Sequence, residues 1–408
     1  MPKRTLNAFG ADRQAAATPP PPRRVTFRAR RGRDVLFASV AGGALAAAAA
    51  AWASPPATSS VTEIGTLNNN TSALSFANAI SADGLVVVGV NSADKPGGGS
   101  QDLAVMWTAA GGLTSLGTFG GSLPGSSAFA VNADGTVIVG ESTVDLGFGF
   151  FGQHAFRWTQ GGGMVDLGTL PNFSDNSAAD GASADGSVVV GTSFKLTDNV
   201  QTGSHAFRWT AASGLVDIGA IAGMPDSTAA GVNSDGSVIV GASGSLDFTG
   251  SGGHAYRWTA ASGMVDLGTI GAVTGTSAAS AVNADGSVVV GGSSFDSSSD
   301  SHAFRWTQAT GMVDLGTING VTGSSSASGV SADGSVIVGN SVVIAGNPQD
   351  EAFRWTVATG MADLNTLLTN AGVTMTGIEL LGAAGVSADG QFIVGEGDFA
   401  DGQHKAYV

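Results

Sequence analysis

A repeat of about fifty residues fills almost the whole chain after residue 60 and limits the possible folds more than any other feature. Three phrases recur in a fixed order, seven times each. Typical copies are Asp-Leu-Gly-Thr-Leu at 166–170, Ser-Ala-Asp-Gly-Ser-Val-Val-Val-Gly at 183–191 and His-Ala-Phe-Arg-Trp-Thr at 154–159. The last copy of the third phrase is cut short, at 405–408. A chain of this kind must build a row or ring of similar units, each packed on its neighbours.

Each phrase has the composition of a short β-strand. The Asp-Gly step between apolar runs predicts a tight hairpin with a type I′ turn, in which both central residues have positive φ. The Arg-Trp-Thr phrase is followed after a few small residues by Gly-Met-Val-Asp-Leu-Gly, which predicts a second hairpin. Four strands per unit, without helical periodicity, predict an all-β fold of β-propeller blades.

The copy number predicts how the ring closes. A lone fourth-strand phrase at 61–67 opens the repeat region, and the chain finishes with the first three strands of a unit. We therefore expect a seven-bladed β-propeller of four-stranded blades spanning 61–408, in which the N-terminal strand completes the last blade. Such closure removes free sheet edges.

The N-terminal segment has the composition of a secretory leader. Nine basic residues precede residue 54, an alanine-rich apolar run covers 35–51, and Ala51-Trp52-Ala53 fits a small-x-small cleavage site. We expect an extended signal peptide at 1–53 and a linker at 54–60. An uncleaved membrane anchor is the alternative, because the apolar run nearly reaches spanning length. The twin-arginine pattern at 23–24 is incomplete.

The charge of the remaining chain restricts its partners. Nine of the 17 basic but only two of the 32 acidic residues lie in the leader, which leaves a net charge of −22. Such a surface repels nucleic acid and anionic lipid, so we expect neither nucleic-acid binding nor membrane insertion of the mature chain. The absence of cysteine from the sequence excludes disulfides and thiolate sites. We expect a monomer that is secreted, periplasmic or held at the cell surface.

A charge pair is predicted from the repeat itself. An arginine of the third strand precedes an aspartate of the fourth strand by nine residues in five units, and a four-residue connection would place the two side chains opposite each other. We expect buried structural ion pairs at these positions. The predicted pairs are Arg157 with Asp166, Arg208 with Asp217, Arg257 with Asp266, Arg305 with Asp314, and Arg354 with Asp363.

Most residues that suggest chemistry are explained by the repeat. Four of the five histidines, His154, His205, His254 and His302, occupy one repeat position and would stand on a ring rather than converge. The Asp-Gly aspartates are explained by turn formation. We therefore expect no catalytic residue, no metal site and no cofactor. Calcium is the one ion left open, because acidic loop clusters occur at 296–300 and 175–180, although their spacing fits no defined site.

The connections of variable length indicate where function lies. Those between the second and third strands, and those between units, differ from copy to copy and emerge on one face of a propeller. Variable loops on a rigid scaffold are the usual place for binding sites. The candidate ligand-binding residues on this face are Phe148, Phe150 and Phe151, in a Gly-rich loop, with Asp296 and Asp300. The phenylalanines form either an exposed apolar patch or a loop folded back over its blade.

The phrase His-Ala-Phe-Arg-Trp-Thr, followed by Gly-Met-Val-Asp-Leu-Gly-Thr, resembles the HAF family of probable extracellular repeats. The resemblance covers 61–408 and implies a secreted or surface propeller. The first unit and Glu351 of the sixth depart from the histidine position, which argues against a functional role for that histidine.

Three functions fit these observations. The first is a secreted or cell-surface, non-catalytic scaffold that binds extracellular protein or glycan through its variable loops. The second is a secreted glycan-active hydrolase or lyase that uses loop carboxylates, so enzymatic activity stays open. The third is a purely structural envelope component.

Overall fold

The structure, a computed structural model, describes residues 59–67, 74–94, 98–173, 176–197, 200–244, 253–271, 275–294, 300–320, 323–343 and 349–408. The leader expected at 1–53, most of the linker and Asp296 lie outside the described residues. In this part of the chain no helix is both long enough and apolar enough to cross a membrane.

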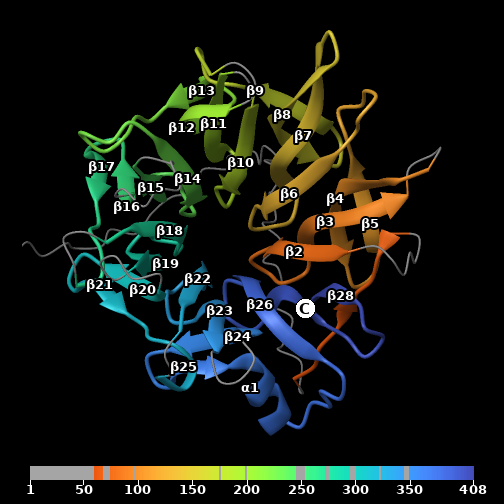
Figure 1. The fold of residues 1–408 in the computed structure, drawn as a ribbon, viewed down its shortest axis with the longest axis vertical. Helices are drawn as coiled ribbons and strands as arrows, with labels where there is room; N and C mark the ends of the chain where they lie inside the picture. Colours follow the sequence, from red (N-terminus) through yellow and green to blue (C-terminus); the bar gives the residue numbers. More distant parts are fainter. Residues whose placement is uncertain are drawn as a thin grey trace, which may run out of the picture. The chain divides into compact units, whose positions relative to one another are not determined.

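The described strands form antiparallel groups of four, and the groups follow one another around a common centre (Figure 1). We number these groups 1 to 7 in chain order. Group 1 comprises β2 (Ser75–Ile80), β3 (Val87–Asp94), β4 (Ser100–Thr108) and β5 (Gly112–Gly117). Group 2 comprises β6 (Ser126–Val131), β7 (Val137–Gly147), β8 (Phe150–Thr159) and β9 (Gly163–Gly168). Group 3 comprises β10 (Asn176–Ala182), β11 (Val188–Thr197), β12 (Val200–Thr210) and β13 (Gly214–Asp217).

The remaining groups follow the same order. Group 4 comprises β14 (Ser227–Val232), β15 (Val238–Ser243), β16 (His254–Thr259) and β17 (Gly263–Asp266). Group 5 comprises β18 (Ser277–Val282), β19 (Val288–Ser294), β20 (Ser301–Thr307) and β21 (Gly311–Asp314), followed by the short 3-10 helix η2 (Ile318–Gly320). Group 6 comprises β22 (Ser325–Val330), β23 (Ile337–Val343), β24 (Gln349–Thr356) and β25 (Gly360–Asp363), followed by helix α1 (Leu364–Asn370). Group 7 comprises β26 (Glu379–Val386), β27 (Ile393–Asp398), β28 (His404–Tyr407) and β1 (Glu63–Ile64).

Strand β1 belongs to group 7 although it comes first in the chain. It pairs antiparallel with β28, with Glu63 opposite Tyr407. Groups 2 and 3 are joined into one larger sheet by a single parallel contact between Asn176 and Gln153.

The strands have two distinct ends. At the turn end lie the connections between first and second strands, such as 82–85, and between third and fourth strands, such as 109–111. At the loop end lie the connections between second and third strands and between groups. At the turn end, backbone hydrogen bonds link each group to the next: the amide of Ala82 donates to the carbonyl of Ala133, and so on through residues 184, 234, 284 and 332 to Ala388, whose amide donates back to Ala82.

The Asp-Gly turn differs from the sequence prediction. Its glycine has positive φ (+75° at Gly84), but its aspartate is not among the residues with positive φ, so the type I′ prediction is wrong. The turn spans four residues between Ser81 and Val86, whose backbones pair. The side chain of Ser81 accepts from the amide of Val86 and donates to Asp83. The longer turn leaves the residue before the aspartate free to bond to the neighbouring group.

The predicted register of the second hairpin is wrong by one residue. Arg257 lies opposite Val265, and Asp266 lies opposite Tyr256. The connection contains three residues instead of four, because Thr259 pairs with Gly263, whose φ of +65° closes the hairpin earlier. The same register holds for Arg157, Arg208, Arg305 and Arg354, so none of the five arginines lies opposite its predicted aspartate.

Two of the arginines instead donate to the neighbouring group. Arg157 Nε donates to the carbonyl of Gly186 at 3.2 Å, and Arg257 Nε donates to that of Gly286 at 3.0 Å. Both carbonyls belong to Asp-Gly turns of the next group. Arg157 and Arg257 therefore link their groups to the next ones at the turn end, whereas Nε of Arg305 is buried without a hydrogen-bond partner among the described residues.

The core lies between neighbouring groups. Between groups 3 and 4, a buried cluster contains Val188, Val190, Ala206, Ile239 and Tyr256. In every group, the backbone of the first strand lies close to the glycine that ends this second-strand phrase: a Cβ on Gly191 would stand 2.0 Å from the carbonyl oxygen of Ala178, and also 2.8 Å from Cζ of Phe207. This close approach explains why the Val-Val-Val phrase always ends in glycine.

Candidate functional site

The most exposed large apolar side chain among the described residues, that of Phe148, lies at the tip of the hairpin formed by β7 and β8, which projects at the loop end of group 2 (Figure 1). Phe148 is fully exposed and Phe150 is 61% exposed. We call residues 146–151 the aromatic tip. Of the predicted site residues, Phe148, Phe150 and Phe151 lie together here.

The geometry of the aromatic tip presents Phe148 outward. Phe148 and Gly149 have φ values of +54° and +81°, which is a two-residue type I′ turn. Asn or Gly usually fills such a position, because an aromatic residue with positive φ is strained. Asp145 accepts a hydrogen bond from the amide of Gly147 at 2.8 Å and thereby fixes the base of the turn. Phe148 therefore combines a strained backbone conformation with a fully exposed aromatic ring.

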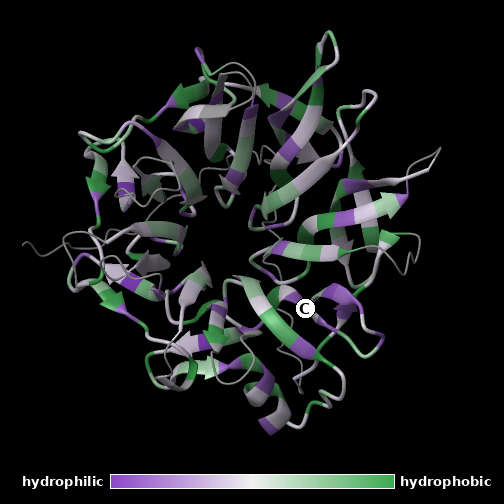
Figure 2. Ribbon diagram, in the orientation of Figure 1, coloured by the Kyte–Doolittle hydropathy of each residue, from purple (hydrophilic) through white to green (hydrophobic). Residues whose placement is uncertain are grey.

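A second connection lies beside the aromatic tip. A Cβ on Gly121 would stand 3.9 Å from Cβ of Asp145, so the connection between β5 and β6 runs next to the hairpin. This connection carries Leu123, which is 52% exposed, and the tip adds Leu146, which is 39% exposed. Figure 2 shows that the hairpin carries hydrophobic as well as hydrophilic residues. Group 2 therefore combines several exposed apolar side chains at its loop end.

The four repeated histidines contact the aspartates that had been assigned to the arginines. Nδ1 of His205 lies 2.7 Å from Asp217, and the pairs His154–Asp166, His254–Asp266 and His302–Asp314 measure 2.8–3.0 Å. Burial acts to raise the pKa of Asp166, but hydrogen bonds from His154 and the amide of Gly168 hold it below its usual value. Sequence reasoning missed these pairs because of the register error; the constant twelve-residue spacing from His to Asp was the available signal.

Group 6 replaces this pair with two carboxylates. Glu351 stands where groups 2 to 5 have histidine, and it lines a pocket with Asp363, Glu379 and Asp398. Burial, together with the negative charges of Asp363 and Glu379, raises the pKa of Glu351. Asp363 also caps α1 by accepting from the amides of Asn365 and Thr366. Within the described residues, no cluster of three or more histidines and carboxylates has the arrangement needed to hold a metal ion.

The innermost strands carry one further unusual carboxylate. Every first strand has a β-bulge at one position, and Asp180 occupies it in β10. The bulges of the other six groups fall on Asn78, Phe129, Ala230, Ser280, Ser328 and Ala384. Burial, with a smaller contribution from the charge of Glu141, raises the pKa of Asp180 to about 7. Asp180 can therefore exchange a proton near neutral pH.

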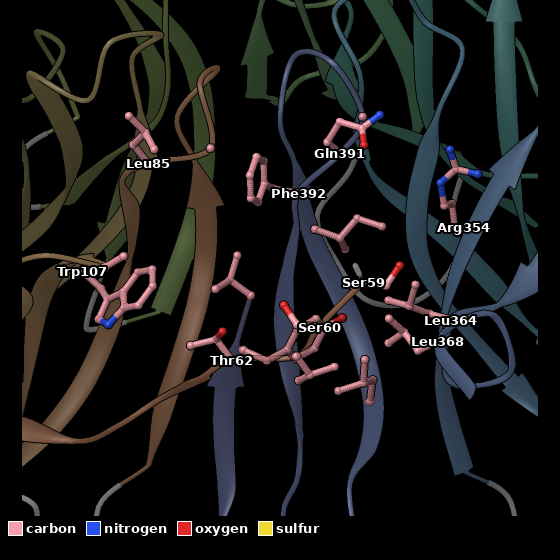
Figure 3. Close-up of a pocket in the computed structure, with 18 of the residues that line it drawn as sticks. Ser59, Ser60, Thr62, Leu85, Trp107, Arg354, Leu364, Leu368, Gln391 and Phe392 are labelled. Carbon is pink, nitrogen blue, oxygen red and sulfur yellow. The ribbon is translucent and has the colours of Figure 1, made fainter. Parts of the chain in front are cut away.

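The remaining predicted site residues do not join the aromatic tip. Asp300 lies just before β20, in group 5, and Asp296 lies outside the described residues. A calcium site built from this pair is therefore not described. The structure also contains a largely apolar pocket of about 710 Å³ where β1 meets β28, which the sequence did not indicate (Figure 3).

Comparison with solved structures identifies the architecture. The chain aligns with the β-propeller domain of the Trilobed protease from Pyrococcus furiosus over 81% of its own length and 94% of that chain, at 9% identity and a TM-score of 0.51. The fold is a β-propeller. An oligogalacturonate lyase from Vibrio parahaemolyticus aligns over 85% of this chain and 92% of that chain, at 11% identity and a TM-score of 0.52.

Other comparisons add less. TolB from Acinetobacter baumannii aligns over 79% of this chain and 65% of its own chain, at 12% identity and a TM-score of 0.43. No protein-family model matches the sequence, and no curated protein matches it. At these identities, the likeness to solved structures concerns the fold alone.

Proposed function

We propose that the protein is a secreted or cell-surface binding module of the HAF repeat type, which engages an extracellular protein or glycan through the aromatic tip. The proposal rests on one observation: Phe148 is fully exposed on a strained turn at the end of a long hairpin. Strain at a position where Gly or Asn would fit better is typical of functional sites. Exposed aromatic side chains are the usual anchors of binding surfaces.

The proposed scaffold is a seven-bladed propeller closed by β1. The pairing of β1 with β28 and the hydrogen bond from Ala388 back to Ala82 support closure without a free edge between the first and last groups. A closed ring holds the loop ends at fixed positions, which lowers the entropy lost when a partner binds.

The test compares matched variants on defined probes. The purified protein is screened against a glycan array and against calcium with thermal shift as the readout, and each hit is titrated. The double variant Phe148→Asn, Phe150→Ser should weaken a true ligand at least tenfold, because it removes both exposed rings. Val265→Ser is the control, since Val265 is exposed on the fourth strand of group 4. Unchanged affinity of the double variant would contradict the proposal.

The acidic pocket of group 6 favours a second candidate, a glycan-active hydrolase or lyase. Burial raises the pKa of Glu351 beside the carboxylate of Asp363, and the general acid of a glycosidase is a carboxyl group whose pKa is raised in this way. One structural neighbour, the enzyme from Vibrio parahaemolyticus, is an oligogalacturonate lyase. Release of reducing ends from a panel of neutral and uronic-acid oligosaccharides, or of unsaturated sugars from the uronic-acid members, lost in Glu351→Gln but kept in Phe148→Asn, would support this candidate against the first.

A further inference from the structure

The first strands of the groups lie nearest the common centre and form the inner ring of the propeller (Figure 1). Neighbouring first strands come into contact at their β-bulges. A Cβ on Gly181, directly after the bulge of β10, would stand 3.4 Å from Cα of Gly231 in β14. A Cβ on Gly385 in β26 would likewise stand 3.5 Å from Cα of Ala79 in β2. The side chain at each bulge therefore lies where two groups meet.

Asn78 shows what a side chain at the bulge can do. Its Nδ2 donates to the carbonyl of Ala128 at 2.8 Å. Ala128 directly precedes the bulge of β6, so this hydrogen bond joins the first strands of groups 1 and 2. The bulge side chain of one group thus reaches the carbonyl before the bulge of the next. By the same register, the side chain of Asp180 in β10 faces the carbonyl of Ala229 in β14.

Asp180 places an acceptor where Asn78 has a donor. An ionised carboxylate cannot donate, so two acceptor oxygens face each other between β10 and β14. In the described part of the chain, no donor lies within hydrogen-bond distance of Asp180. Only a protonated carboxyl group can reproduce the hydrogen bond that Asn78 makes. Burial raises the pKa of Asp180 to about 7, so the protonated form is available near neutral pH.

The charged groups around Asp180 favour its protonated form. The strands packed most closely against β10 are β6, β7, β8, β11 and β14, and β6 and β14 carry no charged residue. Glu141 of β7 acts on Asp180 through its negative charge. The other charged residues of these strands are directed elsewhere: Asp145 to the amide of Gly147, His154 to Asp166, Arg157 to the carbonyl of Gly186, and Lys195 to solvent. These strands therefore offer no cation that stabilises the ionised carboxylate.

Tyr256 supplies a donor for the ionised form. It occupies the third-strand position that holds phenylalanine in groups 2, 3, 5 and 6, and it is fully buried. Its hydroxyl has no hydrogen-bond partner in the described structure, whereas the equivalent hydroxyl of Tyr407 donates to the carbonyl of Gly382. Burial, with a smaller contribution from the charge of Asp180, raises the pKa of Tyr256. The unpartnered hydroxyl is therefore within electrostatic reach of Asp180.

We propose that Asp180 is a proton-dependent link between groups 3 and 4. When protonated, its carboxyl group donates to the carbonyl of Ala229, as Asn78 donates to Ala128. When the O–H bond breaks, the proton passes to bulk water, because Asp180 is partly exposed. The carboxylate then turns away from the carbonyl and accepts from the hydroxyl of Tyr256. Acidification therefore joins β10 to β14 at the inner ring, and alkalisation opens this one contact.

Thermal unfolding of matched variants against pH tests the link. Because the pKa of Asp180 is raised above its unfolded value of about 4, its contribution to stability falls between pH 4 and pH 7 and then stays constant. Asp180→Asn keeps a donor but does not titrate, so it should raise Tm by about 4 °C at pH 8 and leave Tm unchanged at pH 4. Asn78→Asp is the reverse change in group 1 and should lower Tm far more at pH 8 than at pH 4. Effects that are independent of pH in both variants would overturn the proposal.

Two further arms separate the partners of the carboxylate. Infrared spectroscopy follows the band of the protonated carboxyl group that Asp180→Asn lacks. Tyr256→Phe, which restores the residue of groups 2, 3, 5 and 6, should raise the midpoint of that band by about one pH unit, because the ionised form loses its donor. An unchanged midpoint would overturn the role of Tyr256. Calcium chloride is compared with choline chloride at pH 8: stabilisation by calcium that Asp180→Asn loses would overturn the proton-dependent link and assign the carboxylate to a cation.

Discussion

The turn end and the loop end of the propeller are formed by the same strands but differ in how far the groups resemble one another. At the turn end, Ala82 and its six equivalents link each group to the next, and Arg257 and Arg157 add side-chain hydrogen bonds between groups. At the loop end, Phe148 is fully exposed and Glu351 faces other carboxylates. The sequence and structure of the repeat are therefore kept at the turn end, where each group must bond to two neighbours. Residues and connection lengths vary at the loop end, where such bonds are not required.

The largest expected effect separates the two ends through matched glycines. Gly236 and Gly147 both have positive φ, +73° and +84°. A Cβ on Gly236 would lie 2.5 Å from Cγ2 of Val188, whereas Gly147 has nothing within 4 Å. Gly236→Ala should cost about 3 kcal/mol through strain plus overpacking, and Gly147→Ala about 1 kcal/mol through strain alone. Denaturant unfolding measures the free energy of unfolding of both variants. Equal losses of stability would contradict the proposed difference between the turn end and the loop end.

The next effect tests the corrected pairing. Arg257→Ala should cost about 1–3 kcal/mol, because Gly286 loses a hydrogen bond at the turn end. Asp266 contacts His254 at the loop end, so its replacement should add to that loss with no coupling. Equilibrium unfolding of Arg257→Ala, Asp266→Ala and the double variant provides the cycle. A coupling energy above about 0.5 kcal/mol would show that Arg257 and Asp266 interact and would contradict the corrected pairing.

A smaller effect concerns the pH dependence of stability, which should have opposite signs at the two ends. At the turn end, hydrogen bonds from the amide of Ser187 and the hydroxyl of Ser183 lower the pKa of Asp185 to about 2. Its contribution to stability is present above the unfolded pKa, near 4, and is lost as the pH falls toward 2. Asp185→Asn should therefore destabilise at pH 7 and have less effect at pH 2.

At the loop end the sign reverses. Because the pKa of Glu351 is raised, its carboxylate destabilises the fold once the pH exceeds the unfolded value. Glu351→Gln should therefore stabilise slightly at pH 7 and have no effect near pH 3. Thermal unfolding from pH 2 to pH 8 gives both profiles, and parallel profiles for the two variants would contradict the assignment.

The smallest effect would convert group 6 to the pattern of groups 2 to 5. Glu351→His should form a pair with Asp363 and raise stability by about 0.5 kcal/mol, as expected for a half-exposed ion pair. Glu351→Gln serves as the control that removes the negative charge without adding a partner. If the two variants are equally stable at pH 6, the histidine–aspartate contact contributes nothing and only carboxylate repulsion matters.

Much of the fold could be predicted from the sequence, because the same strand and turn phrases recur in every unit. The strand phrases and the places of the Asp-Gly hairpins were predicted from residue patterns alone, although the turn type was wrong. For the phenylalanines of the second unit, the patterns left exposure and folding back over the blade as two alternatives. The register of the second hairpin was not predicted correctly, because it depends on Gly263 and its equivalents adopting positive φ, a choice that alternation of apolar residues does not encode. That single-residue error assigned the aspartates to the arginines and concealed the histidine pairs.

Features that occur once were harder to predict. Helix α1 follows β25 in group 6 only, and its seven residues carry no helical periodicity long enough to detect. The raised pKa of Asp180 depends on its place in a bulge beside Glu141, which belongs to another group. The aromatic tip was expected as a Gly-rich loop, but β7 and β8 extend to Gly147 and Phe150 and carry Phe148 on a two-residue turn. Long strands hold Phe148 in place more firmly than a loop would.

The chain of hydrogen bonds from Ala82 through Ala388 and back to Ala82 has a consequence for the order of the polypeptide. Each group bonds to the next in the same way, so the contacts do not specify which group must come first in the gene. New termini could be opened at a loop-end connection such as 118–125 and the natural ends joined by a short linker. Circularly permuted genes of this kind should encode the same molecule, and duplication of whole units is the natural route by which such a chain could have grown.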